Sequence, residues 1–109
     1  MEEAMEYQFS PMSETSYCIL LSLVEERHGY GIMQHVSDLT KGRINLGAGT
    51  IYGTLAKLEN TKLIAMSKEE DKRKYYKITQ EGLDVLKVEL NRIAQLYQIG
   101  EEVLLNGRK

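Results

Sequence analysis

Apolar side chains recur at helical spacing in the first part of the chain. Ser13 is a suitable N-cap for this segment, because its hydroxyl can accept a bond from the first turn of a helix. The apolar face then follows the i, i+3, i+4, i+7 pattern at Tyr17, Leu20, Leu21 and Val24. The spacing predicts a helix that ends near Arg27, and residues 1–12 are expected to form an arm or a short extra helix.

Two further helices are predicted downstream. His28 and Gly29 interrupt the first helix, and the second helix is expected to stop before Gly42. The third helix follows small residues, Gly47-Ala48-Gly49, and is expected to end near Asn60. The apolar positions are Ile32, Met33, Val36 and Leu39 in the second helix and Ile51, Leu55 and Leu58 in the third. Between the two helices, residues 43–46 are long enough only for a small strand.

The next segment has the pattern of a β-hairpin. Two apolar or aromatic runs, residues 63–66 and 75–78, flank the strongly charged residues 67–74, which predict a long charged tip. Strand alternation places Tyr76 on the same face as Ile78, in the core, and leaves Tyr75 more exposed.

A long helix is predicted for the C-terminal segment, with Thr79 as its cap and an end near residue 106. Apolar positions spaced alternately by three and four form a heptad seam: Leu83, Leu86, Leu90, Ile93, Tyr97, Gly100 and Leu104. A second stripe consists of Val85, Leu96, Ile99 and Val103. Two apolar faces need two partners, so we expect one face on the domain itself and the other on a second protomer. A helix that packs only on its own core is the alternative.

The predicted order of helix, helix, short strand, helix, hairpin and long helix describes a winged helix-turn-helix domain with an extra C-terminal helix. The fold class is therefore mainly α with a small β-hairpin. A length of 109 residues fits one domain with an appended element. We expect residues 13–79 to form the winged helix-turn-helix domain and residues 80–109 to form a dimerisation helix.

Charge is unevenly distributed along the chain, although the net charge is only −2. Residues 1–40 carry seven acidic side chains and one basic one, a net charge of −6. Residues 41–77 carry nine basic and four acidic side chains, a net charge of +5. The basic centre favours double-stranded DNA as a partner.

The third helix and the hairpin carry the candidate DNA-binding residues. With the apolar face inward, small and polar side chains face outward, and such a helix can enter a major groove. The glycines before the helix expose N–H groups that suit a phosphate, although a plain tight turn is the alternative. Cations on the returning strand can follow the duplex backbone. The candidates are Tyr30, Lys41, Gly47, Gly49, Thr50, Tyr52, Gly53, Thr54, Lys57, Lys72, Arg73, Lys74 and Tyr75.

Catalytic and metal-binding patterns are poor, so we expect neither an enzyme nor a metal site nor a cofactor. His28 and His35 are separated by a helix break, and Cys18 lies in an apolar helix, where a thiol behaves as a small hydrophobic group. The lone cysteine fits a reducing cytoplasm. The longest apolar run is too short for a membrane span, and we expect no membrane partner.

Four segments together resemble the signature of the PadR family of transcriptional regulators. They are His28-Gly29-Tyr30-Gly31-Ile32, Leu46-Gly47-Ala48-Gly49-Thr50-Ile51-Tyr52, Leu55-Ala56-Lys57-Leu58-Glu59 and Arg73-Lys74-Tyr75-Tyr76-Lys77-Ile78-Thr79-Gln80-Glu81-Gly82. The segments follow in the family's order and cover residues 13–82 well. The long amphipathic helix after them is similar to that of the short, single-helix subgroup.

The resemblance implies a cytoplasmic homodimer, usually a repressor, that binds a palindromic operator and is released by a small aromatic or hydrophobic effector. The dimerisation residues would be Leu83, Leu86, Leu90, Ile93, Tyr97 and Leu104. The effector would lie near Met5, Phe9, Met12 and Tyr97, although these are also ordinary packing residues. One subgroup holds flat drugs between tryptophans, and this chain has no Trp. The alternative is a winged-helix module that binds protein rather than DNA.

Overall fold

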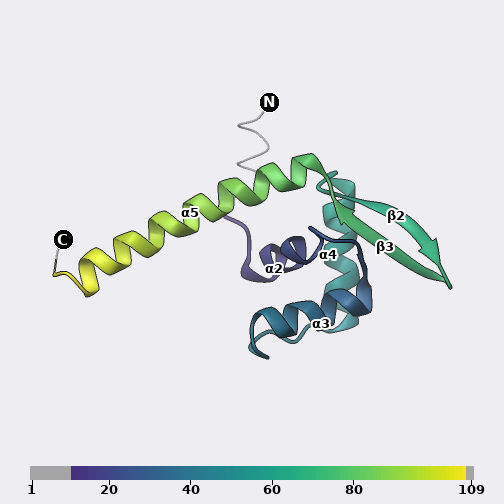
Figure 1. The fold of residues 1–109 in the computed structure, drawn as a ribbon, viewed down its shortest axis with the longest axis horizontal. Helices are drawn as coiled ribbons and strands as arrows, with labels where there is room; N and C mark the ends of the chain where they lie inside the picture. The colour runs from purple at the N-terminus through teal and green to yellow at the C-terminus, as the bar shows by residue number, and fades with distance from the viewer. Residues whose placement is uncertain (1–10, 108–109) are drawn as a thin grey trace.

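The computed structural model describes residues 11–107, which form a helical body with a small sheet at one side. The elements are α2 (Glu14–Ser22), β1 (Arg27–His28), α3 (Gly29–Leu39), α4 (Ala48–Asn60), β2 (Ile64–Glu70), β3 (Arg73–Ile78) and α5 (Gln80–Leu104). The sheet is antiparallel with the strand order β1-β3-β2. Figure 1 shows the β2–β3 hairpin projecting from one side of the body and α5 extending away on the other. This architecture confirms the predicted winged helix-turn-helix fold.

Side-chain caps fix where three of the described helices begin. Ser13 Oγ accepts a bond from the Ser16 N–H at 3.1 Å, and Thr79 Oγ1 accepts one from the Gly82 N–H at 3.1 Å. His28 caps α3 through Nδ1, which accepts the N–H of Gly31 at 3.3 Å. Each bond satisfies one of the donors that the first turn of a helix leaves unpaired. The predicted caps at positions 13 and 79 are confirmed.

The core lies where α2, α3 and α4 meet the base of the hairpin and the first turns of α5. Its buried members include Ile19, Leu20, Leu23, Ile32, Val36, Ile51, Leu55, Leu58, Leu63, Ile64, Tyr76, Val85 and Leu86. Five of the seven predicted helix positions in α3 and α4 are thus fully buried or nearly so, and Leu58 with its neighbours anchors the inner face of α4. Leu39 at the end of α3 is exposed.

The first helix is shorter than predicted, and the small strand lies elsewhere. Helix α2 ends at Ser22, and Val24 is 44% exposed. The chain then turns so that Arg27 and His28 can pair with β3 as a short strand. Residues 43–46, predicted to be a small strand, form a loop instead. The correction has a physical reason: strand formation needs a distant partner, which the local pattern does not reveal.

The charged segment predicted as a long hairpin tip is mostly strand. Only Asp71 and Lys72 form the turn, and both have positive φ angles, 53° and 63°. Such two-residue turns match the twist of paired strands. Opposite charges face each other across the strands at Glu69 and Lys74 and at Glu70 and Arg73, which favours pairing despite the high charge.

One apolar stripe on α5 runs from the domain toward the end of the helix, and Leu90, Tyr97 and Ile99 are exposed outside it. Gly82, Val85, Leu86 and Glu89 are buried against the domain. The stripe continues at Ile93, Leu96, Gly100 and Val103, and three of these side chains are 38%, 54% and 49% exposed. Figure 1 shows the outer part of α5 running beyond the body. Leu86 therefore packs in its own core with 6% exposure, which corrects its assignment to the dimerisation seam.

Candidate nucleic-acid interface

The outer face of α4 is small, polar and open. Thr50, Gly53 and Lys57 are exposed, and Thr54 is half-buried. A Cβ atom built at Gly47, Gly49 or Gly53 would meet nothing within 4 Å. A glycine inside a helix costs about 1 kcal/mol relative to alanine. Since nothing within the described chain approaches Gly53, packing inside the domain does not explain it.

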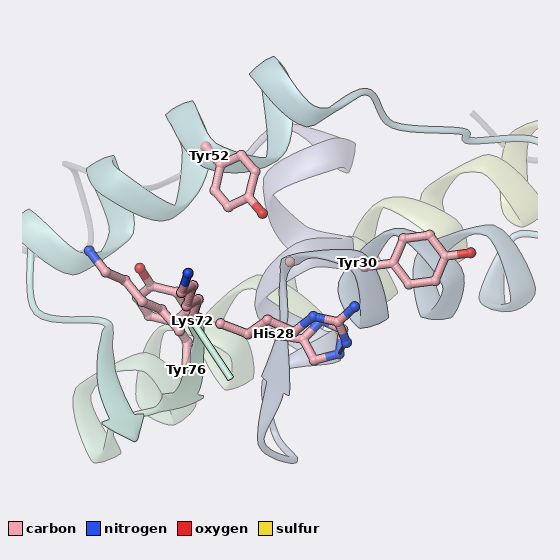
Figure 2. Close-up of a pocket in the computed structure, with 8 residues that line it drawn as sticks. His28, Tyr30, Tyr52, Lys72 and Tyr76 are labelled. Carbon is pink, nitrogen blue, oxygen red and sulfur yellow. Dashed lines mark hydrogen bonds between the residues drawn. The ribbon is translucent and has the colours of Figure 1, made fainter. Parts of the chain in front are cut away.

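A cleft opens between the start of α3, the outer side of α4 and the β2–β3 hairpin, which we call the wing. It encloses about 310 Å³. Its lining residues are His28, Gly29, Tyr30, Tyr52, Lys72, Arg73, Lys74 and Tyr76. Figure 2 shows the lining residues of the three elements, with the Tyr30 ring pointing away from Tyr52, Lys72 and Tyr76. The structure thus brings together five of the predicted DNA-binding residues, and three lining residues, His28, Gly29 and Tyr76, were not among the predictions.

His28 joins the start of α3 to the wing. Its ring lies edge-on to the Tyr75 ring, with 5.1 Å between the ring centroids and 84° between the ring planes. Arg73 Nη1 lies 3.3 Å from His28 Nε2, while Nδ1 caps Gly31. A neutral imidazole has only one nitrogen that accepts a hydrogen bond, so it cannot serve both donors. With Nδ1 engaged by the cap, the Arg73 guanidinium remains available to another acceptor.

Ion pairs sort the wing cations into two groups. Lys68 lies 3.3 Å from a Glu70 carboxylate oxygen and 3.7 Å from one of Glu26, and the hydrogen bond that Lys68 donates to Glu70 raises the pKa of Lys68. Lys72, Arg73 and Lys74 form no ion pair with any acidic side chain in residues 11–107. Three unpaired cations therefore gather at the turn and the start of β3, and Lys77 near the end of that strand forms no ion pair in residues 11–107 either.

Tyr75 lies apart from the other predicted wing residues. Lys68 Nζ is 4.7 Å from the centroid of the Tyr75 ring, and His28 packs against the same ring. Tyr75 is half-buried and does not line the cleft, whereas Tyr76 is buried and does. The predicted contrast in exposure is confirmed, but a buried aromatic ring can still present its hydroxyl to a cleft.

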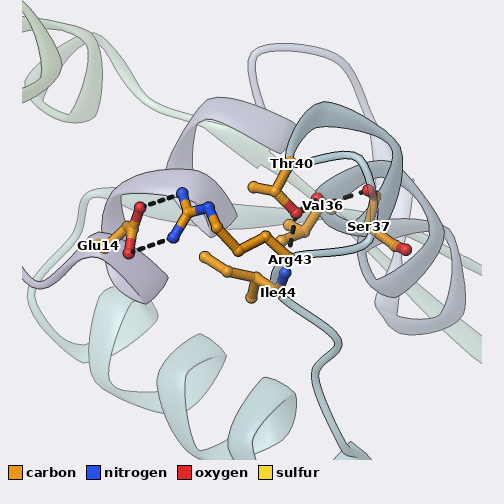
Figure 3. A network of polar contacts seen from close by, with 6 residues as sticks. All are labelled: Glu14, Val36, Ser37, Thr40, Arg43 and Ile44. Carbon is orange, nitrogen blue, oxygen red and sulfur yellow. Dashed lines mark hydrogen bonds and ion pairs between the residues drawn. The ribbon is translucent and has the colours of Figure 1, made fainter.

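The loop before α4 is held by side-chain bonds (Figure 3). Arg43 donates to both carboxylate oxygens of Glu14, with Nη1 3.1 Å from Oε1. This hydrogen bond lowers the pKa of Glu14. Thr40 Oγ1 donates to the carbonyl of Val36 at 2.9 Å and accepts the N–H of Ile44 at 3.0 Å. The pairing with Glu14 occupies Arg43, one of the nine bases that suggested a basic centre.

The remaining predicted residues are scattered. Lys41 is exposed in the loop after α3, at the opposite end of that helix from the cleft. Leu83 is half-buried, while Leu90, Ile93, Tyr97 and Leu104 are 58%, 38%, 67% and 81% exposed. Met12 packs against the core, and its N–H donates to Glu89 Oε1 at 2.9 Å. Met5 and Phe9 lie outside the described residues.

The described residues also bear on metal binding and on membrane insertion. In residues 11–107, no group of three or more His, Cys, Asp or Glu side chains is placed to hold a metal ion. No helix in that part of the chain is both long enough and apolar enough to span a membrane.

A comparison with protein families identifies the chain. Residues 19–88 match the family described as the transcriptional regulator PadR-like family. The chain belongs to this PadR-like family. Membership confirms the resemblance of the four sequence segments, and it agrees with the expectation of a regulator rather than an enzyme.

Individual relatives are similar over different lengths. An uncharacterised protein X of Lysinibacillus sphaericus is 30% identical over 88 residues, which cover 77% of this chain and 81% of the relative. The transcriptional regulator YqjI of Escherichia coli is 33% identical over 58 residues, or 53% of this chain. The matching part of this PadR-like chain spans only 28% of the length of YqjI.

Solved structures share the PadR-like fold. A transcriptional regulator from Clostridium thermocellum has a TM-score of 0.72 at 25% identity, covering 82% of this chain and 88% of that one. A PadR-like regulator from Bacillus cereus has a TM-score of 0.70 at 27% identity, covering 84% and 91%. A PadR-like transcription factor from Bacteroides fragilis has a TM-score of 0.69 at 29% identity, covering 82% and 88%.

Proposed function

We propose that this PadR-like regulator binds double-stranded DNA through α4 and the wing, as a homodimer that acts as a repressor. The observation that carries the proposal is the open glycine face of α4 beside unpaired wing cations. Gly49 and Gly53 carry no Cβ atom, and a Cβ atom built at either position would meet nothing within 4 Å. The absence of side chains lets a duplex approach the helix backbone closely, while Thr50, Thr54 and Lys57 can reach base edges.

The cationic side chains of the wing would provide the electrostatic attraction to DNA in the proposed interface. Lys72, Arg73 and Lys74 face the same cleft as Tyr52 of α4. Cations placed beside a reading helix bind the duplex backbone and fix the register of the helix in the groove. A helix of ordinary solvent-exposed character would lack both the adjoining unpaired cations and the glycine pattern.

The substitution Gly53→Ala tests the role of α4. Alanine should stabilise the helix by up to about 1 kcal/mol, because it reduces the backbone entropy lost on folding and meets no neighbour. The same methyl group should weaken duplex binding if the helix enters a groove. The measurements are thermal unfolding and fluorescence anisotropy with a DNA duplex. A variant that gains stability and binds DNA as tightly as the wild type would argue against this face.

The uncovered half of the α5 stripe supports the proposal of a homodimer. Ile93, Leu96 and Val103, which continue the stripe, are 38%, 54% and 49% exposed in the single chain. Burial of one such aliphatic side chain contributes roughly 1.5 to 3 kcal/mol, so a second α5 is a favourable cover for the stripe. A two-fold dimer should bind a palindrome with half-sites about 34 to 36 Å apart, or a multiple of that spacing. Selection of duplexes from a random pool should return such a palindrome, and a single asymmetric site would contradict a symmetric dimer.

Release by a small effector is the remaining part of the proposal. The bond from the Met12 N–H to Glu89 links the start of the described chain to α5, so a ligand that displaces Met12 would act directly on that helix. Phenolic acids and cationic drugs are screened for release of the selected duplex from the wild type and from Tyr97→Ala. A ligand near Tyr97 predicts a weakened response in the variant. An undiminished response would place the ligand elsewhere.

A further inference from the structure

We propose that the cleft binds one phosphate group through the hydroxyl of Tyr76 and the ammonium groups of Lys72 and Lys74. This inference rests on the proposed function, and it adds a specific residue to it. Tyr76 would be a phosphate ligand as well as a member of the core. Tyr52 from α4 and the start of α3 would complete the surroundings of the phosphate.

The state of the Tyr76 hydroxyl is the first observation. Tyr76 is only 8% exposed, yet it lines the cleft (Figure 2), and its hydroxyl forms no hydrogen bond with any described residue. No side-chain nitrogen or oxygen in the described part of the chain is both sealed from solvent and without a partner. The Tyr76 hydroxyl must therefore be partly exposed to solvent, and the cleft is the open space that the Tyr76 ring borders. A phenol in this position can donate to an anion.

The charges around this hydroxyl favour an anion. Lys74 and Tyr76 lie two residues apart on β3 and so project from the same face of the strand. Three cationic side chains line the cleft, and no carboxylate does. Burial, followed by the nearby Glu59 and Tyr52, raises the pKa of Tyr76, so the phenol keeps the proton that it would donate. The negative charge of Glu59 disfavours an anion near Tyr76, but Glu59 does not line the cleft, whereas three cationic side chains do.

The backbone at Lys72 is the second observation. Lys72 holds a φ angle of 63°, a conformation that glycine or asparagine adopts at less cost. The two-residue hairpin turn itself requires a positive φ angle at both Asp71 and Lys72. The turn conformation alone does not require a lysine, whereas a phosphate in the cleft would use its charge.

A backbone phosphate of DNA and a free phosphate share this chemistry. The cleft lies beside the exposed face of α4, so a duplex that meets this helix would bring its backbone to the cleft. We therefore expect a phosphodiester of DNA to be the ligand. Inorganic phosphate is the probe that tests for binding of a free phosphate.

Two matched variants of the full chain test the inference. Tyr76→Phe removes the hydroxyl from the cleft, and Tyr17→Phe makes the same change on a half-buried ring of α2, outside the lining. Binding of a random-sequence duplex is followed by anisotropy between about 50 and 200 mM salt. We expect Tyr76→Phe to bind about tenfold more weakly at every salt concentration, as for loss of a hydrogen bond to a charged group. The salt slope should not change, because a phenol displaces no counterion, and Tyr17→Phe should stay within about twofold of the wild type.

The other outcomes separate this inference from the proposed function. If the wild type binds duplex and Tyr76→Phe binds equally well, the phosphate ligand is wrong and DNA binding stands. A melting temperature several degrees lower in Tyr76→Phe would make the hydroxyl a structural group and overturn the inference. If the wild type does not bind duplex, a titration with inorganic phosphate, followed by NMR, tests whether the cleft binds free phosphate. Shifts at the cleft residues that vanish in Tyr76→Phe would support a free phosphate, and their absence would overturn the site.

Discussion

At the scale of single residues, a short polar chain joins α2 to α3 inside the domain. The Ser22 hydroxyl donates to the carbonyl of Cys18 at 2.9 Å, and Ser22 Oγ lies 3.0 Å from His35 Nδ1. Since the Ser22 proton is already donated, the imidazole must donate from Nδ1. Ser22 is fully buried, so loss of this bond would leave a buried hydroxyl with an unused acceptor.

This junction predicts a dependence of stability on pH. Burial, followed by the positive charge of Arg27, lowers the pKa of His35 below its ordinary value of 6.5. The unfolded chain therefore binds the proton more readily than the folded one. The stability contribution is present above pH 6.5 and is lost as the pH falls through the lower pKa of the folded state.

Urea unfolding of the wild type and of His35→Gln between about pH 8 and about pH 5 checks this prediction, in a range above the ordinary carboxylate pKa values. The wild type should lose stability toward the acidic end, and the variant should show a flatter profile. Parallel profiles would assign the loss to another group.

At the scale of elements, the first turn of α5 packs against the base of the wing. A Cβ atom at Gly82 would lie 2.3 Å from the Leu63 carbonyl oxygen and 2.5 Å from Ile78 Cγ1. The backbone oxygen cannot move aside as a flexible side chain can. Gly82 therefore sets how closely the helix approaches the hairpin, and through it where α5 leaves the domain.

The substitution Gly82→Ala should lower the free energy of unfolding by about 1 to 3 kcal/mol, the usual cost of overpacking. Gly100→Ala is the matched control on the same helix, because a Cβ there meets nothing within 4 Å. The control should gain up to about 1 kcal/mol in helix stability. Urea midpoints measure both values, and equal effects at the two positions would contradict the close packing at Gly82.

The elements with local signals could be predicted from the sequence, and those that need a distant partner could not. The caps at Ser13 and Thr79 and the end of α4 at Asn60 follow from nearby residues. Strand β1 does not, because Arg27 and His28 become a strand only through pairing with β3. The candidate site behaves in the same way. Side-chain type singled out the wing cations, but the role of Tyr76 at the cleft depends on the folded arrangement of three elements.

At the scale of the whole molecule, the described chain is elongated. Its extents are 56, 37 and 21 Å, and the outer half of α5 runs beyond the body (Figure 1). The domain covers the stripe only as far as Glu89, since Ile93, Leu96 and Val103 are exposed. In a dimer joined through α5, this helix would set the distance between the two α4 helices. A small change in the angle at which the α5 helices cross would therefore alter the spacing of the two half-sites that the dimer can bind.

The substitution Leu96→Glu tests whether the stripe holds a dimer. Leu96 is 54% exposed in the single chain, so a charge there should leave the domain folded and split the dimer. Gln95→Glu is the control, because it adds the same charge at the neighbouring exposed polar position of α5. Light scattering at micromolar concentration should give a monomer for the first variant and a dimer for the second. A dimer in both would place the interface elsewhere.

The central claim, that α4 and the wing bind DNA, is tested most directly by the salt dependence of duplex binding for two lysine variants. Lys74 is unpaired and lines the cleft, while Lys68 is held by Glu26 and Glu70 on the same hairpin. We predict that Lys74→Gln weakens binding and reduces the slope of log K against log salt by about 0.9, the value for one lost phosphate contact. Lys68→Gln should keep the slope of the wild type. Equal effects of the two substitutions, or binding that does not depend on salt, would contradict the account.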